Sequence, residues 1–273
     1  MELVSVVIPT FNQAEYLAAC LDSLFFQEYE RLELIVVNDG STDATAAVLD
    51  EYLRDVATDL ASFACAYDAV TESIRRGYHA RYPTGVALRV LHNPRNLGLA
   101  ATLNVGVKAA TGAYCTYVPS DNLCYPHMIG ELVAALKGTG QEAEADFAYA
   151  DMTIVTDAMR VLRRFSLPAY SFEACFLDWY LCGVAKLYRT SLHERHGYYC
   201  EELLAHDHEL FLRFAEAGAK FRHVPKALMA VRDHGRQRSV DIHAPANWRR
   251  LLEESKELVR RARAFSSVAG RRG

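Results

Sequence analysis

The feature that most constrains the fold is a set of four short apolar runs, each followed at once by a polar turn. They are VSVVI (residues 4–8), LELIVV (32–37), ALRVLHN (87–93) and AYCTYV (113–118). Runs of this length are typical of strands buried on both faces of a parallel sheet. Segments with helical periodicity separate them. The sequence therefore predicts an α/β fold made of βαβ units, with a mostly parallel, Rossmann-like sheet and helices on both faces.

The polar turns after these runs are expected to meet at one edge of the sheet. They cover residues 9–12, 38–43, 93–98 and 120–122. In open parallel sheets, ligands bind just beyond the carboxyl ends of the strands. Single turns rich in Gly, Asn and Asp are common, but four on one edge favour a binding site. The sequence therefore predicts a ligand site along this edge, with ordinary turns as the alternative.

Two of these turns also resemble the starts of helices. Asn12 with Glu15 has the spacing of a capping box. Ser41 or Asp43 can cap the helix that follows the second run. For Asn12 and Ser41, a role in helix capping and a role in ligand binding therefore both stay open.

Composition restricts the class of protein. A formal net charge of −4 over 273 residues does not provide the basic surface expected of a nucleic-acid-binding protein. The apolar runs are shorter than the roughly 20 residues that span a bilayer, and the start MELVSVVIPTFN lacks the pattern of a signal peptide. Seven scattered cysteines without a C-x-x-C pair predict free thiols in a reducing compartment. We expect a cytoplasmic protein, with any membrane contact peripheral at the inner face.

The remaining segments are less regular. Residues 54–86 are Ala-rich and read as helical, so we expect an inserted helical hairpin or an extended helix that serves packing or oligomerisation. Residues 146–156 and 160–167 are expected to form paired strands. A helix with an apolar stripe is expected over 205–218, and a charged helical tail over 244–273.

Four stretches together resemble the inverting family 2 glycosyltransferases of the GT-A fold. They are VSVVIPTFNQAEYLAACLDSLFFQ, ELIVVNDGSTDAT, NPRNLGLAATLNVGVKAATGAYCTYVPSDN and HGYYCEELLAHDHELFLRFAEAG. The resemblance covers about residues 3–235, apart from 54–86. It implies a nucleotide-sugar-binding half (1–125), a smaller acceptor-side half (126–243) and the tail. The implied reaction moves a sugar from a nucleotide-diphosphate sugar, usually a UDP-sugar, to a glycan or lipid-linked acceptor in polysaccharide or glycan synthesis.

The resemblance also implies which residues surround the donor nucleotide. They are Pro9, Thr10, Phe11, Asn12, Asp39, Ser41, Arg95, Asn96, Ser120 and Asp121. Asp39 matches the acidic residue that hydrogen-bonds the base, and a carboxylate can accept from a base N–H. Arg95 could instead be an ordinary surface charge.

Inverting transfer needs a base that deprotonates the acceptor hydroxyl. Asp207 matches the Asp of the Glu-Asp motif found at a helix start in the family, although His206 stands where the Glu is usual. Glu209 is the second candidate. Acidic residues in a first helical turn also interact well with the helix dipole, so a purely structural role stays open for both.

The resemblance further implies a divalent cation, Mn²⁺ or Mg²⁺, at the donor diphosphate. The usual Asp-x-Asp-Asp motif is reduced here, because Pro119 replaces the first Asp and Asn122 the last. We expect Asp121, Asn122 and His234 to hold the cation weakly, with the diphosphate supplying much of the coordination. Basic residues of the late loop that could meet the diphosphate are Arg232, Arg236 and Arg238.

Three functions remain in competition. The first is a metal-dependent inverting glycosyltransferase, in which a homo-oligomer is compatible with the sequence. The second is a non-catalytic nucleotide-sugar binder or scaffold on the same fold, favoured by the lost carboxylates and by His206. The third is a nucleotidyltransferase, but PTFNQAEY is not the Gly-rich, basic loop expected after its first strand.

Overall fold

The computed structural model describes residues 1–138, 140, 143–178, 180–234 and 244–269. Its strands are β1 (Val4–Thr10), β2 (Leu32–Asn38), β3 (Leu60–Asp68), β4 (Ser73–Ala80), β5 (Val86–His92), β6 (Tyr114–Tyr117), β7 (Leu123–Cys124), β8 (Phe147–Thr156), β9 (Val161–Phe165), β10 (Lys186–Arg189) and β11 (Phe221–Asp233). Its helices are α1 (Ala14–Phe25), α2 (Thr45–Thr58), α3 (Leu99–Ala109), α4 (Met128–Lys137), α5 (Phe172–Phe176), α6 (Ser191–His196), α7 (His206–Glu216) and α9 (Pro245–Ala269).

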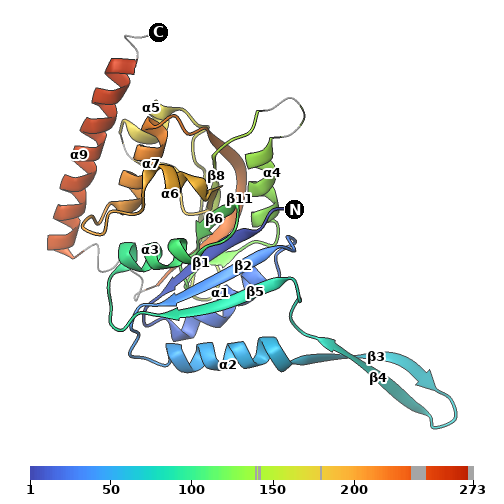
Figure 1. Cartoon of the computed structure of the whole chain (residues 1–273). Helices are drawn as coiled ribbons and strands as arrows, with labels where there is room; N and C mark the ends of the chain where they lie inside the picture. Colours follow the sequence, from blue (N-terminus) through green and yellow to red (C-terminus); the bar gives the residue numbers. More distant parts are fainter. Residues whose placement is uncertain (139, 141–142, 179, 235–243, 270–273) are drawn as a thin grey trace.

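One central sheet with strand order β5-β2-β1-β6-β10-β8-β11-β7 organises the molecule (Figure 1). β5, β2, β1 and β6 are parallel, as the four apolar runs predict. β10 is antiparallel to both of its neighbours, and β8 pairs with β9 antiparallel, as predicted from residues 146–167. The α/β prediction is confirmed. The sheet is mixed beyond β6, and the division of the chain at residue 125 stays a prediction.

Helices cover both faces of the sheet, and each face has its own apolar cluster. On one face, Leu17, Leu21 and Leu24 of α1 pack with α2 and α4 against β1 and β2. On the other face, Leu103 of α3 and Phe211 of α7 lie in a second cluster with α5 and α6. Because β1 and β2 are buried at every position, their sequences contain apolar residues without alternation. This packing fixes the carboxyl edge, where the predicted turns lie.

The prediction of a helical insertion over residues 54–86 is wrong. α2 extends to Thr58, and the chain then forms the two-stranded hairpin β3–β4, which projects from the body (Figure 1). Asp68 Oδ1 accepts hydrogen bonds from the backbone N–H of Val70 and Thr71, which closes the turn locally. β4 is exposed at all but one of its positions, so packing against the body does not stabilise a helix here and the Ala-rich composition does not decide the structure.

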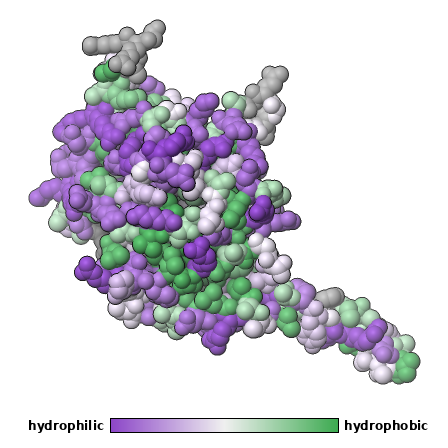
Figure 2. All heavy atoms as spheres, in the orientation of Figure 1, coloured by the Kyte–Doolittle hydropathy of each residue, from purple (hydrophilic) through white to green (hydrophobic). Residues whose placement is uncertain are grey.

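The projecting hairpin leaves apolar side chains in contact with solvent. Tyr67 and Ile74 are cross-strand partners and are 63% and 58% exposed, and Val70 in the turn is 94% exposed. Figure 2 shows apolar residues at the tip of this arm beside hydrophilic ones. The predicted role of this segment in oligomerisation stays a prediction.

Two expectations from composition can be compared with the structure. No helix within the described ranges is both long enough and apolar enough to cross a membrane. All seven cysteines are free thiols and five of them are buried, as their spacing predicts, whereas the reducing compartment stays a prediction.

Two buried histidines predict that the fold loses stability in mild acid. His193 and His208 are buried, and this burial lowers the pKa of each from 6.5 to about 4. Between these two pH values the unfolded chain binds protons that the folded chain does not, so stability falls as the pH falls. We expect the free energy of unfolding to drop by roughly 3 kcal/mol per histidine across this window. Urea unfolding at a series of pH values measures the drop.

His208→Phe provides the matched control for this prediction. His208 stacks on the rings of Phe176 and Tyr180, so a phenyl ring suits the site and does not titrate. The variant should lose only the part of the acid sensitivity that belongs to residue 208. A free energy of unfolding that is constant from pH 7 to pH 5 in the unmodified protein would contradict the prediction.

Candidate active site

A cavity of about 340 Å³ lies where the sequence predicts a ligand site, at the carboxyl ends of β1, β2 and β6. Seven of the ten residues predicted around a nucleotide line it: Pro9, Thr10, Phe11, Asp39, Asn96, Ser120 and Asp121. Asn12, Ser41 and Arg95 are not among its lining residues. Ligand pockets commonly enclose about 300–1,000 Å³, so a nucleotide-sized molecule fits this class of cavity.

Asp39 joins the turn after β2 to the turn after β5. Its carboxylate is buried and accepts hydrogen bonds from Asn93 Nδ2 (2.8 Å), Leu97 N (2.9 Å) and Gly98 N (3.0 Å). A carboxylate has about four sites that can accept hydrogen bonds, so roughly one remains. Asp39 therefore orders the loop before α3 and keeps one acceptor position for a donor in the cavity.

Gly40 allows the same two turns to touch. It has φ 69°, and a Cβ atom at this position would lie 2.5 Å from the carbonyl carbon of Arg95 and 2.7 Å from the N of Asn96. A side chain here would collide with backbone that cannot move aside cheaply. The turns after β2 and β5 consequently act as one unit at the mouth of the cavity.

The capping-box prediction for Asn12 and Glu15 is wrong. Helix α1 begins after Gln13 without a side-chain cap, and Asn12 has a positive φ of 52°. Its Oδ1 instead accepts from the backbone N of Thr42 at 2.8 Å, and its own N–H donates to Ser41 Oγ at 3.0 Å. A pairing between residues about 30 positions apart replaces the local cap, so Asn12 and Ser41 hold the turns after β1 and β2 together.

Asp43 comes nearest to the capping role predicted for α2. The residue at the N-cap of that helix is Ala44, which has no side-chain oxygen. Asp43 Oδ1 accepts from the backbone N of Thr45 at 2.9 Å, and its Oδ2 accepts from Ala14 N at 3.2 Å. Asp43 therefore serves the first turns of both α1 and α2 and lies outside the cavity lining.

The predicted metal residues divide into a pair and a separate residue. Asp121 lines the cavity, and its Oδ2 lies 3.1 Å from His234 Nε2 at the end of β11. Asn122 is 3% exposed, and its Oδ1 accepts from the backbone N of Arg232 at 3.2 Å. Asp121 and His234 present an oxygen and a nitrogen of types that bind Mn²⁺, whereas the Asn122 oxygen is committed to β11.

Of the three arginines predicted to meet the diphosphate, the structure describes one. Arg232 is 7% exposed, and it donates to the backbone carbonyls of Asp121 (3.1 Å) and Asp157 (3.0 Å). Arg236 and Arg238 lie outside the described residues. In the part of the chain that the structure describes, no group of three or more His, Cys, Asp and Glu side chains could hold a metal ion. A cation held by Asp121 and His234 would therefore need further ligands beyond these two described side chains.

Asp207 lies in the first turn of α7, which follows the cavity-lining residue Leu204. The Tyr117 hydroxyl donates to Asp207 Oδ2, and Lys186 Nζ lies 3.8 Å from the same oxygen. The side chain of Asp207 is 22% exposed, whereas that of Lys186 is fully buried. Asp207 is thus a partly exposed carboxylate with a hydroxyl and an ammonium behind it.

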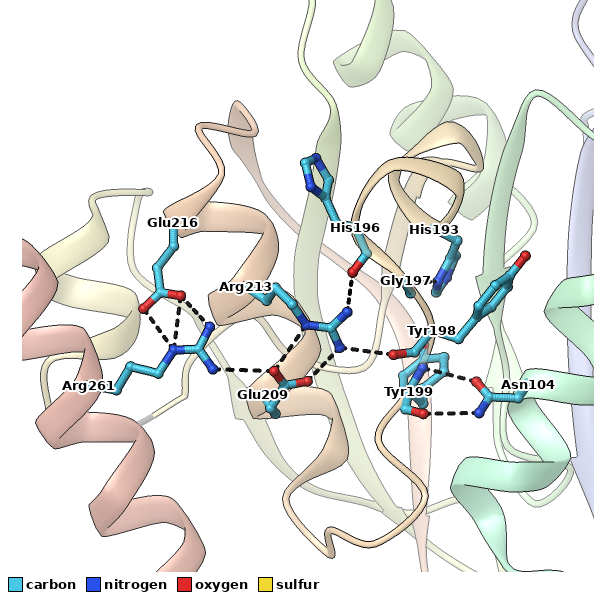
Figure 3. Close-up of polar contacts among 10 residues, drawn as sticks. All are labelled: Asn104, His193, His196, Gly197, Tyr198, Tyr199, Glu209, Arg213, Glu216 and Arg261. Atoms are coloured by element: carbon cyan, nitrogen blue, oxygen red, sulfur yellow. Dashed lines mark hydrogen bonds and ion pairs between the residues drawn. The ribbon is translucent and has the colours of Figure 1, made fainter.

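Glu209, the second candidate base, is engaged elsewhere (Figure 3). Its carboxylate accepts from Arg213 Nε (3.0 Å) and Nη2 (2.6 Å) and from Arg261 Nη1 of α9 (3.3 Å). Arg213 also donates to the Tyr198 carbonyl at 2.9 Å, and Arg261 binds Glu216. The side chain of Glu209 is 12% exposed and does not line the cavity. Its position therefore fits a bridge between α7 and α9.

The sequence did not indicate several residues of the site. Gln13, Gly98, Leu99, Thr102, Leu204 and Asn247 also line the cavity. Asn247 comes from α9, and Glu254 of the same helix accepts the backbone N–H groups of Leu204 (2.7 Å) and Ala205 (2.9 Å) before α7. No local pattern could reveal these contacts. One further residue near the site did have a signal in the sequence. Lys186 is a lone lysine inside an apolar stretch, and it lies 3.8 Å from Asp207.

The fold and the cavity together define a class of protein. A parallel sheet with a nucleotide-sized cavity at its carboxyl edge, extended by a mixed sheet and a helix with an acidic first turn, is the GT-A glycosyltransferase architecture. The structure aligns with S. aureus TarS 1–349 in complex with UDP-GlcNAc at TM-score 0.67 and 20% identity, over 95% of this chain and 66% of that one. It also aligns with the mannosyltransferase PcManGT from Pyrobaculum calidifontis in complex with GDP-Man and Mn²⁺, at TM-score 0.61 and 18% identity, over 100% of this chain and 76% of that one.

The sequence comparison gives the family. The model of glycosyl transferase family 2 matches residues 5–59 and 69–197, so the chain belongs to this family. Glycosyltransferase GlyG of Streptococcus pneumoniae serotype 4 is 30% identical over 145 residues, which cover 53% of this chain and 37% of GlyG. The matched region thus spans little more than a third of that relative. The resemblance predicted from the motifs is confirmed.

Proposed function

We propose that the chain transfers a sugar from a nucleotide-diphosphate sugar to an acceptor hydroxyl, with inversion at the anomeric carbon. The observation that carries the proposal is the lining of one cavity. This cavity contains Asp39, whose carboxylate can accept a hydrogen bond from a nucleobase, and Asp121, and the start of α7 lies at its edge. The same edge of the sheet would therefore hold, side by side, the nucleobase of the donor, its diphosphate and the acceptor hydroxyl that reacts. A role in polysaccharide or glycan synthesis is the corresponding biological proposal.

Asp39 supports a UDP-sugar as the donor. The remaining acceptor position of its carboxylate suits the N–H of a uracil ring, and Phe11, which is 41% exposed, offers an aromatic face beside it. One aligned structure was solved with UDP-GlcNAc, and another with GDP-Man. We infer that uridine is preferred, because loop atoms already occupy the other positions of the Asp39 carboxylate.

Asp207 would act as the base. A carboxylate that is 22% exposed can reach an acceptor hydroxyl, accept its proton and leave the oxygen free to attack the anomeric carbon. The hydrogen bond from Tyr117 to Oδ2 fixes the orientation of the carboxylate, whereas Oδ1 is a buried atom. Glu209 stays a second candidate whose ion pairs with Arg213 and Arg261 would first have to break.

Asp121 and His234 would hold a divalent cation. A bound Mn²⁺ or Mg²⁺ would neutralise charge on the diphosphate leaving group. Two protein ligands are few, and metal ions commonly have four to six or more ligands, so the diphosphate itself would supply much of the coordination. We therefore propose weak binding of the metal by the free protein and tighter binding with the donor present.

The proposed function is tested with a panel of nucleotide sugars, each with Mn²⁺ or Mg²⁺, by following release of the nucleoside diphosphate. We expect release with at least one UDP-sugar and its loss after thorough chelation, because the leaving group is no longer neutralised. Asp43→Asn, which lies outside the cavity, serves as a control that keeps activity. Unchanged activity after chelation would refute the metal proposal.

The alternative is a nucleotide-sugar binder without catalysis. The reduced acidic motif and His206 favour it, because each removes a carboxylate that the family usually has. Tight binding of UDP without turnover or hydrolysis of any donor would support this alternative. Isothermal titration with UDP, run beside the release assay, separates the two functions.

A further inference from the structure

Lys186 is a buried lysine directly behind the proposed base. Its side chain has no exposed surface, and within the described residues its ammonium nitrogen has no hydrogen-bond partner. The nitrogen lies 3.8 Å from Asp207 Oδ2, 4.0 Å from the ring centroid of Tyr117 and 5.3 Å from that of Phe211. Burying an ammonium costs several kcal/mol, so a buried lysine of this kind needs a physical explanation.

The surroundings of Lys186 fit a charged ammonium better than a neutral amine. Two aromatic faces attract a cation, and Tyr117 contributes both its ring to Lys186 and its hydroxyl to Asp207. Burial raises the pKa of Cys182 well above its ordinary value, so this neighbour stays a neutral thiol. Burial lowers the pKa of Lys186, and the negative charge of Asp207 opposes that change.

Among the described residues, Lys186 and His206 are the basic side chains that lie within 4 Å of the Asp207 carboxylate. His206 Nε2 lies 3.9 Å from Asp207 Oδ1, and its side chain is 2% exposed. Burial raises the pKa values of Tyr180, Tyr188 and Tyr199, so these three hydroxyls stay neutral. In the part of the chain that the structure describes, Lys186 is therefore the lysine whose ammonium lies close to the Asp207 carboxylate.

We propose that Lys186 is a positioning residue whose buried ammonium keeps the Asp207 carboxylate ionised and holds it against Tyr117. The proposal rests on the proposed function only in naming Asp207 as the base. A nearby cation favours the charged carboxylate and so lowers its pKa. Removal of the cation must therefore raise the pKa of Asp207 and move the acid limb of the activity profile to higher pH.

Lys186→Met tests this arrangement in the full chain. Methionine has a similar length, and its thioether packs well against the rings of Tyr117 and Phe211. We expect the pKa of the Asp207 carboxyl to rise by about 1–3 units, because an opposite charge within this distance has an effect of that size. ¹³C NMR of carboxyl-labelled aspartate gives the titration, and the Asp207 resonance is the one absent from Asp207→Asn.

The acid limb of kcat for the active donor should shift in the same direction, with kcat recovering at higher pH and KM for the donor unchanged. A residue that only packs would lower kcat at every pH and leave the limb in place. Lys108→Met is the matched control, since Lys108 also lies over a tyrosine ring, 5.2 Å from the centroid of Tyr198, but on the exposed side of α3. It should leave both titrations unchanged.

An Asp207 pKa that is the same in Lys186→Met and in the unmodified protein would overturn the proposal. The NMR titration needs no substrate, so this failure is distinct from failure of the proposed function, which shows as absence of turnover with every donor. Should the Met variant not fold, Lys186→Gln provides the same test with another neutral side chain. We expect the Met variant to melt at a lower temperature than the unmodified protein, because it removes one member of the ion pair and leaves the Asp207 carboxylate without its counter-charge.

Discussion

Asp207→Asn is expected to lower kcat for sugar transfer by about 10²- to 10⁴-fold, the usual contribution of a general base. Asparagine has nearly the same shape, and its Oδ1 can still accept the hydrogen bond from Tyr117, but an amide does not take a proton near neutral pH. The donor cavity does not include this side chain, so KM for the nucleotide sugar should change little. Steady-state kinetics with the active donor give both constants.

Glu209→Gln is the matched control, because it makes the same chemical change in the same helical turn. Its carboxylate is bound to Arg213 and Arg261, so its loss should weaken the contact between α7 and α9 and lower the melting temperature while kcat falls only a few-fold. Should Asp207→Asn stay active while Glu209→Gln loses activity, the base would be Glu209. The melting temperature of Asp207→Asn is needed as well, because this variant leaves Lys186 as a buried cation without its counter-charge.

Asp39→Asn is expected to weaken UDP binding by about 10- to 100-fold, an effect of 1–3 kcal/mol for a buried group left with a mismatched partner. The new amide nitrogen must replace one carboxylate oxygen. It therefore faces either the backbone N–H of Gly98 or the N–H of the uracil ring. Both arrangements place two donors against each other. Isothermal titration with UDP measures the affinity, and urea unfolding measures the accompanying loss of stability in the loop before α3.

Asp43→Asn separates the effect on the ligand from the effect on the loop. Asp43 also accepts backbone hydrogen bonds in the turn after β2, but it is not part of the cavity lining. It should lose stability as Asp39→Asn does and keep its affinity for UDP. Equal loss of UDP affinity in both variants would mean that Asp39 acts only by ordering the turn.

The strands and the binding edge were predictable because their signals are local. A strand that is buried on both faces must be apolar throughout, as in β1 and β2, and the chain must turn where such a run ends. The carboxyl ends of parallel strands necessarily share one edge, so the strand pattern alone places the turns at Asp39 and Asp121 together. The order of the motifs then pointed to the family.

The local signals failed where several structures fit the same residues. The composition of residues 54–86 suits a helix, but the segment projects from the body and pairs with itself as β3–β4. Asn12 has the residue type and spacing of a helix cap, yet its side chain bonds to the turn at Thr42 instead. In both cases contacts beyond the next helical turn decide the result.

The parallel half of the sheet, the edge that carries the cavity and the residue types that face it all follow from local sequence patterns. Which of those residues act together depends on how the chain packs. Asp207 and Tyr117 are 90 positions apart, and Asp121 and His234 are 113 apart, so no spacing rule connects them. The role of Lys186 depends on the tertiary structure in the same way. The free-energy cost of its buried charge is set by the groups that the packed fold brings within a few ångströms.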